Sequence, residues 1–183
     1  MLVVHPQDST TSMLAALYCG RNATVLTQHH SCTEIRSRIY HTPPAERIML
    51  LGHGSEKGLL SRSASPPAEF DRLIISRAHA YPLRRHGANL IGIWCHANLF
   101  ARQHGLRGLF SGMVITEQSE AEEYGIPTTR AEQDRENLLL FSTLRRLLDA
   151  DTPLHLIPEL MPTMDTTLSP LTVFNYQSFY VFL

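Results

Sequence analysis

Short apolar runs recur along the first two thirds of the chain, separated by more polar stretches. They cover Leu2 to His5, Thr24 to Thr27, Ile48 to Leu51, Leu90 to Trp94 and Leu109 to Thr116. Continuous apolar runs of this length are typical of strands that are buried on both faces of a parallel sheet. We therefore expect five buried strands, and the turn-flanked segment Gly58 to Ser61 predicts a further short one.

Apolar residues at helical spacing fill the intervals between these runs. The pattern predicts helices over Thr11 to Cys19, from Ser31 to the Pro43-Pro44 break, from Ala68 to about Arg85, and from Asn98 to His104. Ser31 and Glu34 form a capping-box signature at the start of the second helix. Alternating strands and helices indicate an α/β fold, a three-layer α/β/α sandwich with a mainly parallel sheet.

The remainder of the chain is less regular. A short acidic helix is expected over Glu117 to Tyr124, and the longest helix over Thr129 to Asp149. Residues 151 to 170 contain four prolines and predict irregular structure, as does the loop Ser63 to Pro67. The alternating, aromatic-rich segment Leu171 to Leu183 predicts a final strand.

Composition and charge narrow the class of protein. The chain has 183 residues, of which 43% are hydrophobic and 18% are charged, which indicates one globular domain over residues 1–183 with its core in 1–150. The net charge of −1 gives no reason to expect binding to nucleic acid or to an anionic membrane. Three cysteines, with no leader-like or membrane-spanning run, favour a reduced, cytoplasmic protein.

Two residues with nucleophile and base chemistry follow two of the predicted strands. His53 comes just after the run that ends at Leu51, and Cys95 directly follows the run that ends at Trp94. Chemistry in parallel sheets concentrates at the carboxyl ends of strands. A thiol near the start of the following helix is expected to favour the thiolate. A second interpretation of Cys95 is a packed core cysteine, which is common.

The ordered pair of motifs, Ile48-Met-Leu-Leu-Gly-His53-Gly54 and Ile91-Gly-Ile-Trp-Cys95, resembles the caspase-like cysteine peptidases over about residues 1–150. The resemblance implies that Cys95 is the nucleophile and His53 the general acid and base. It also implies an oxyanion hole made by the backbone N–H groups of Gly54 and Cys95. No cofactor or metal is expected, and the partner would be a peptide or protein substrate.

The resemblance also bears on specificity, because the loop after the first strand helps to select the P1 residue in this group. Here that loop holds Asp8, and Glu117 and Glu120 follow the fifth predicted strand at the same sheet edge. We therefore expect a substrate-binding (S1) site that prefers Lys or Arg. The alternatives are a helix-capping role for Asp8 and a solvated helix start for Glu117 and Glu120.

Other functions stay open at this point. The chain could be an inactive caspase-like binding or scaffold domain. Gly52-His53-Gly54-Ser55 is also similar to the metal-receiving motif of chelatases, although it follows the third predicted strand here. The aromatic run over residues 174–182 predicts a strand whose exposed edge could pair with a second copy of the chain.

Overall fold

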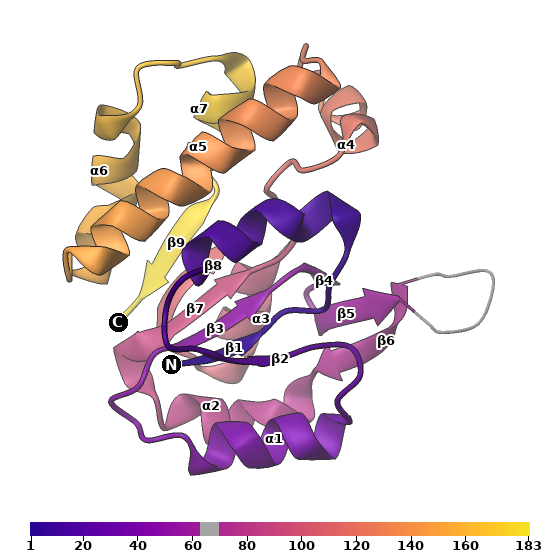
Figure 1. Ribbon diagram of the computed structural model, residues 1–183, viewed down its shortest axis with the longest axis vertical. Helices are drawn as coiled ribbons and strands as arrows, with labels where there is room; N and C mark the ends of the chain where they lie inside the picture. Colours follow the sequence, from indigo (N-terminus) through magenta and orange to yellow (C-terminus); the bar gives the residue numbers. More distant parts are fainter. Residues whose placement is uncertain (63–69) are drawn as a thin grey trace.

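The computed structural model describes residues 1–62 and 70–183, and Figure 1 shows its arrangement. The predicted loop Ser63 to Pro67 and the first two positions of the helix expected from Ala68 lie outside the described residues.

A six-stranded, mainly parallel sheet forms the centre of the molecule. The strand order is β2-β1-β3-β7-β8-β9, and only β9 runs antiparallel to its neighbour. The prediction of an α/β fold with a mainly parallel sheet is confirmed. The strands are β1 (Leu2–Val4), β2 (Thr24–Leu26), β3 (Ile48–Leu51), β7 (Leu90–Ile93), β8 (Gly108–Ser111) and β9 (Phe179–Phe182).

A second, smaller antiparallel sheet branches from the end of β3. It has the order β4-β5-β6 and consists of β4 (His53–Ser55), β5 (Gly58–Arg62) and β6 (Phe70–Ile75). Figure 1 shows this sheet projecting beside the main one. His53 is therefore the first residue of a hairpin and not part of a simple loop.

Helices connect the strands. The α-helices are α1 (Cys32–His41), α2 (Ala80–Arg84), α3 (Ala97–His104), α4 (Gln118–Glu123), α5 (Arg130–Asp149), α6 (Ile157–Met164) and α7 (Pro170–Tyr176). The 3-10 helices are η1 (Ser9–Leu17), η2 (Arg77–His79), η3 (Gly87–Asn89) and η4 (Leu154–Leu156). Within the described parts of the chain, no helix has both the length and the apolar character needed to cross a bilayer.

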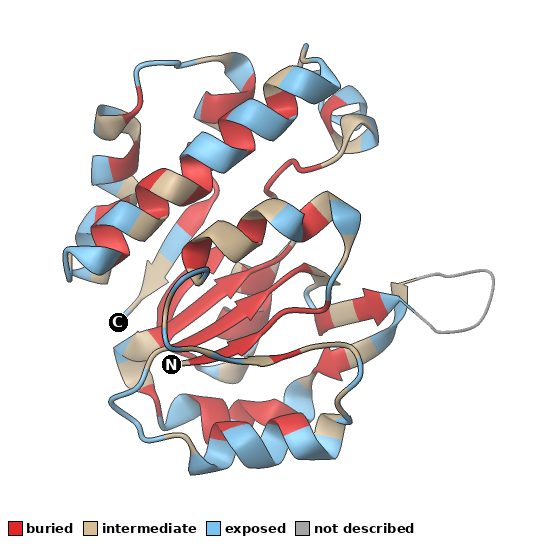
Figure 2. Ribbon diagram, viewed as in Figure 1, coloured by how far each residue is buried: buried red, intermediate tan, exposed pale blue. Residues whose placement is uncertain are grey.

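Alternate side chains of each central strand enter two separate hydrophobic clusters, because successive side chains of a strand point to opposite faces. In β3, Ile48 and Leu50 join a cluster with α1, α2 and α3, whereas Met49 and Leu51 join one with η1, α5 and α6. Figure 1 shows α1 and α2 on one side of the sheet and α5 on the other, and Figure 2 shows the central strands buried. This double burial explains the continuous apolar runs.

The helix expected from Ala68 to Arg85 is wrong over much of its length. Phe70–Ile75 is strand β6, antiparallel to β5, and only Arg77–His79 and Ala80–Arg84 are helical. The β5–β6 register shifts at two places, which disrupts strict alternation of apolar and polar positions. The resulting spacing of Phe70, Leu73 and Ile74 imitates a helical period.

The C-terminal prediction is also partly wrong. Ser169 caps a helix over Pro170–Tyr176, and only Phe179–Phe182 forms the last strand. The proline-containing segment before it includes helix α6, with Pro158 in the first turn, where a missing N–H is tolerated.

The fifth predicted strand is shorter than expected, since β8 ends at Ser111 and not at Thr116. Because β9 lies at one edge of the sheet, pairing with a second copy through this edge stays a prediction.

The hairpin is attached to the main sheet through the end of β7. The backbone N–H of Gly52 donates to the carbonyl of Ile93 at 3.0 Å, and the indole N–H of Trp94 donates to the carbonyl of Ser55 at 3.0 Å. Gly54 lies directly against the Trp94 indole. A Cβ atom at Gly54 would lie 2.7 Å from Cγ of Trp94 and 2.5 Å from the carbonyl oxygen of Gly58.

We predict that Gly54→Ala lowers the free energy of unfolding by about 1–3 kcal/mol, because the added methyl group overpacks this contact. Trp94 is the single tryptophan of the chain, so its fluorescence reports both stability and local displacement. Denaturant unfolding followed by this signal measures the effect. Gly112→Ala is the control, since its Cβ would lie 3.0 Å from Cε2 of the exposed Tyr180, which can move. Equal stabilities of the two variants would contradict the account.

Candidate active site

The paired strands β3 and β7 end two residues before His53 and two residues before Cys95. Each residue of β3 pairs with the residue 42 positions later, from Ile48 with Leu90 to Leu51 with Ile93. His53 and Cys95 are separated by the same 42 positions, two residues beyond the last pair. Parallel strands in this register bring the two residues out at one edge, where parallel sheets hold their sites.

The His53 ring is held by groups from three different segments. Its Nε2 lies 2.6 Å from Oγ1 of Thr10, 3.6 Å from Oδ1 of Asp8 and 3.6 Å from Oε1 of Glu117. The ring also contacts Phe70 of β6, with the centroids 4.3 Å apart. The side chain is 13% exposed, so the imidazole is fixed in position and still accessible.

Cys95 follows β7 and lies in the turn before α3, where its Sγ is 4.0 Å from Oε1 of Glu120. Burial raises the pKa of the Cys95 thiol to about 12, and the negative charge of Glu120 adds to this effect. The expectation that the next helix would favour the thiolate is therefore wrong for this state. Burial and the adjacent carboxylate raise the pKa of the thiol by more than the partial positive charge at the start of a short helix lowers it.

Glu117 and Glu120 carry two roles at once. They form the capping box of α4, and Oε2 of Glu120 accepts hydrogen bonds from the N–H groups of Thr116 at 2.8 Å and of Glu117 at 3.0 Å. Burial raises the pKa of Glu120. The two residues do start a helix, as the alternative interpretation expected, but they are partly buried and not solvated, and both carboxylates approach His53 or Cys95.

Asp8 likewise caps a helix and approaches the site. It caps η1 by accepting from the N–H of Thr10 at 3.0 Å, and its Oδ2 accepts from Nε of Arg62 at 2.8 Å. Burial by itself would raise the pKa of Asp8, but the Thr10 hydrogen bonds and the charge of Arg62 bring it below its ordinary value. Asp8 is therefore an ionised, anchored carboxylate next to His53.

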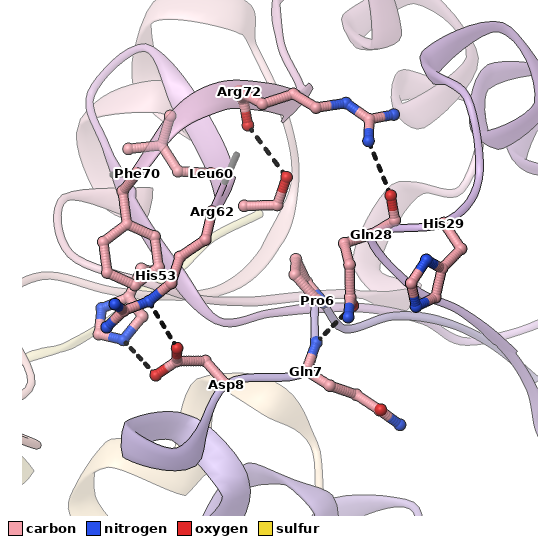
Figure 3. Close-up of a pocket in the computed structure, with 11 residues that line it drawn as sticks. Pro6, Gln7, Asp8, Gln28, His29, His53, Leu60, Arg62, Phe70 and Arg72 are labelled. Atoms are coloured by element: carbon pink, nitrogen blue, oxygen red, sulfur yellow. Dashed lines mark hydrogen bonds and ion pairs between the residues drawn. The ribbon is translucent and has the colours of Figure 1, made fainter. Parts of the chain in front are cut away.

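A cavity of about 470 Å³ opens beside His53 (Figure 3). Its walls come from the loop after β1, the loop after β2 and the small sheet, and they include Asp8, Arg62 and Phe70. A cavity of this size matches a ligand site rather than a packing defect. Among residues 1–62 and 70–183, no group of three His, Cys, Asp or Glu side chains is arranged to hold a metal ion.

The structure brings all the candidate residues to one edge, with Gly54 next to His53 in β4. The contribution of the Gly54 and Cys95 N–H groups to an oxyanion hole stays a prediction. Sequence reasoning missed Thr10, Arg62 and Phe70 as neighbours of this site. Thr10 lies just before the helix expected from Thr11, and Phe70 lies in the segment expected to be a helix.

The chain was compared with known protein families, proteins and structures. No family model, no curated protein and no solved structure matches the chain.

We predict that Glu120→Gln accelerates alkylation of Cys95 by iodoacetamide several-fold at a fixed, mildly alkaline pH. Removing a negative charge beside the thiol lowers its pKa and raises the thiolate fraction at any pH below that pKa. Gln keeps an oxygen to accept from the Thr116 and Glu117 N–H groups. Peptide mass spectrometry measures the rate at Cys95, with the exposed Cys19 as an internal reference.

Glu123→Gln is the matched control, because Glu123 lies on the same helix with its side chain exposed. Its Cys95 rate should equal that of the wild type. An unchanged rate in Glu120→Gln, or a wild-type Cys95 that reacts as fast as Cys19 near neutral pH, would show that the charge argument is wrong.

Proposed function

We propose that the chain is a caspase-like cysteine endopeptidase that cleaves after a basic residue. The observation that carries the proposal is that the paired strands β3 and β7 end two residues before His53 and two residues before Cys95, at one edge of the sheet. Helices on both faces of a mainly parallel sheet are compatible with the three-layer arrangement that the resemblance implies. His53 followed by Gly54, with Cys95 after the neighbouring strand, is the motif order of that family.

The proposed reaction is acyl transfer through a thioester. The Cys95 thiol gives its proton to His53 while the sulfur attacks the carbonyl carbon of the scissile peptide bond. The carbon–nitrogen bond then breaks, and His53 returns the proton to the leaving amine. Water, deprotonated by His53, hydrolyses the thioester and restores the thiol. Thr10 is a positioning residue, since its hydroxyl lies 2.6 Å from the His53 ring.

The raised pKa of Cys95 fits an enzyme that rests with a neutral thiol. Burial and Glu120 keep the proton on sulfur in the absence of substrate. A substrate cation placed near Glu117 and Glu120 would offset their negative charge and ease the loss of that proton. Under this proposal the correct substrate helps to activate the nucleophile.

The preference for Lys or Arg at P1 rests on the charge around the pair. Three carboxylates approach His53 or Cys95: Asp8, from the start of η1, and Glu117 and Glu120, from the start of α4. Carboxylates recognise guanidinium and ammonium groups through charge-assisted hydrogen bonds. An acidic P1 side chain would meet repulsion at this edge.

A second candidate is an inactive binding domain of the same fold. The observation in its favour is the pKa of about 12 for Cys95, which leaves almost no thiolate at neutral pH. In that case His53 and Cys95 would only pack against their neighbours. The two candidates differ in whether any peptide is turned over.

We predict turnover of short fluorogenic peptides with Arg or Lys at P1, and little with Asp or Asn. Cys95→Ala and His53→Ala should each lower kcat/KM by about 10³-fold or more, because nucleophile and proton carrier act as a unit. Glu117→Gln and Glu120→Gln should raise KM for the basic substrates, because each removes a negative charge near the site.

Cys19→Ala and His155→Ala are controls that alter exposed residues of the same types outside the cavity beside His53. They should retain wild-type turnover. Cleavage after Asp would support a peptidase but contradict the predicted preference for Lys or Arg at P1. If none of the four peptides is cleaved faster by the wild type than by Cys95→Ala, the peptidase proposal is wrong and the inactive binding domain replaces it.

A further inference from the structure

Charged residues are separated along the chain and between the two sides of the main sheet. Residues 72–116 contain six arginines and no aspartate or glutamate, whereas residues 117–183 contain eleven acidic residues and four arginines. Helices α2 and α3, from the first of these segments, pack with α1 on one side of the sheet, and α5 and α6, from the second, lie on the other side (Figure 1). The net charge of −1 is therefore compatible with a strongly basic face.

A groove of about 350 Å³ lies between α1 and the η2–α2 segment on this basic side. Its walls include Arg36 and Tyr40 from α1 and Tyr81 from α2, and none of the described residues that line it is acidic. Tyr40 is 47% exposed and Tyr81 is 68% exposed. Singly exposed apolar residues are ordinary, but two exposed aromatic rings on opposite walls of one groove indicate a contact surface.

Arginines surround Tyr81. Three exposed arginines lie three or four residues away from it in sequence, at Arg77, Arg84 and Arg85. Residues at this spacing are neighbours on a helical surface. The most exposed ring of the groove therefore lies within a cluster of positive charge.

Tyr40, on the opposite wall, also lies beside arginines. The guanidinium carbon of Arg85 is 4.6 Å from the centroid of the Tyr40 ring, and its Nη1 donates to the carbonyl of Tyr40 at 2.9 Å. Arg36, one turn before Tyr40 on the same helix, lines the groove itself. Burial lowers the pKa of the neighbouring His79, and the charge of Arg36 lowers it further. Positive charge is thus present on both walls.

Arginines and exposed tyrosines in one groove have the chemistry that binds single-stranded nucleic acid. Guanidinium groups bind phosphates through charge-assisted hydrogen bonds, and unpaired bases stack on aromatic rings. A duplex would offer the arginines its phosphates but would keep its bases away from the tyrosines. An acidic polypeptide would likewise use the arginines and has no planar bases to cover the two rings.

We propose that the α1–α2 groove binds single-stranded nucleic acid, with phosphates on Arg36 and Arg84 and bases on Tyr40 and Tyr81. The proposal is independent of the proposed peptidase function, because none of the candidate catalytic and S1 residues lines this groove. It adds a second binding surface on the side of the sheet that α1 and α2 cover.

The test is fluorescence anisotropy of the full chain with fluorescein-labelled oligodeoxythymidylate and oligouridylate of about twelve nucleotides, a length within the range that single-strand-binding domains occupy. The titrations are made at about 50 mM and about 200 mM NaCl. Both oligonucleotides should bind at the lower salt concentration. Binding should weaken at the higher one, because phosphate contacts release counterions.

Variants of the groove separate the two kinds of contact. Arg36→Gln/Arg84→Gln should weaken binding about tenfold at the lower salt concentration and reduce the salt dependence, because two phosphate contacts are lost. Tyr81→Ala should weaken binding about tenfold at both salt concentrations and leave the salt dependence unchanged, because it removes a stacking surface and no charge.

Arg130→Gln/Arg135→Gln and Tyr124→Ala are the matched controls. They remove the same number of charges from α5 and an exposed tyrosine from the end of α4, both outside the groove. Their affinities should equal that of the wild type, and circular dichroism establishes that every variant is folded.

Three results would overturn the inference: no binding at the lower salt concentration, control variants that lose as much affinity as the groove variants, or competition by a duplex or by poly-L-glutamate that equals competition by the unlabelled single strand. These results are separable from failure of the peptidase. The groove variants should cleave peptides as the wild type does if the peptidase proposal is correct, and they should lose affinity for the oligonucleotides whether or not any peptide is cleaved.

Discussion

The register of β3 against β7 is the constraint on which the candidate site depends. Pairing at a fixed offset of 42 residues ends both strands two residues before His53 and Cys95, at the same edge of the sheet. A slip of one residue would turn every side chain of one strand to the opposite face. The bonds from the Gly52 N–H to the carbonyl of Ile93 and from the Trp94 indole to the carbonyl of Ser55 hold this register at the edge. These contacts therefore support the geometry of the polar residues beside them.

At this edge, the same carboxylates that stabilise helix starts also affect the reactivity of the candidate catalytic residues. Glu120 stabilises the start of α4 through two backbone N–H groups, and the same carboxylate disfavours ionisation of Cys95. Asp8 caps η1 and also binds Arg62 beside His53. Each carboxylate is satisfied in the substrate-free structure by a group of the chain itself. A cationic substrate would therefore act by exchange, replacing contacts that already exist.

The parts of the fold that follow from local pattern were predictable from sequence. The apolar runs identify β3 and β7, and their endings identify His53 and Cys95 as a pair. Phe70–Ile75 was missed because register shifts in β5–β6 remove the alternation that marks a strand. The raised pKa of Cys95 and the Asp8–Arg62 pair depend on burial and on contacts between distant segments, which no local pattern encodes.

The most direct test of the peptidase account is labelling of the protein with an arginyl acyloxymethyl ketone, read out by intact mass and peptide mapping. The account predicts one adduct, on the Cys95 sulfur, that forms at neutral pH despite the raised pKa and is lost in His53→Ala. A reagent that labels only the exposed Cys19, or that labels Cys95 equally well in His53→Ala, would contradict a functional pair at this sheet edge.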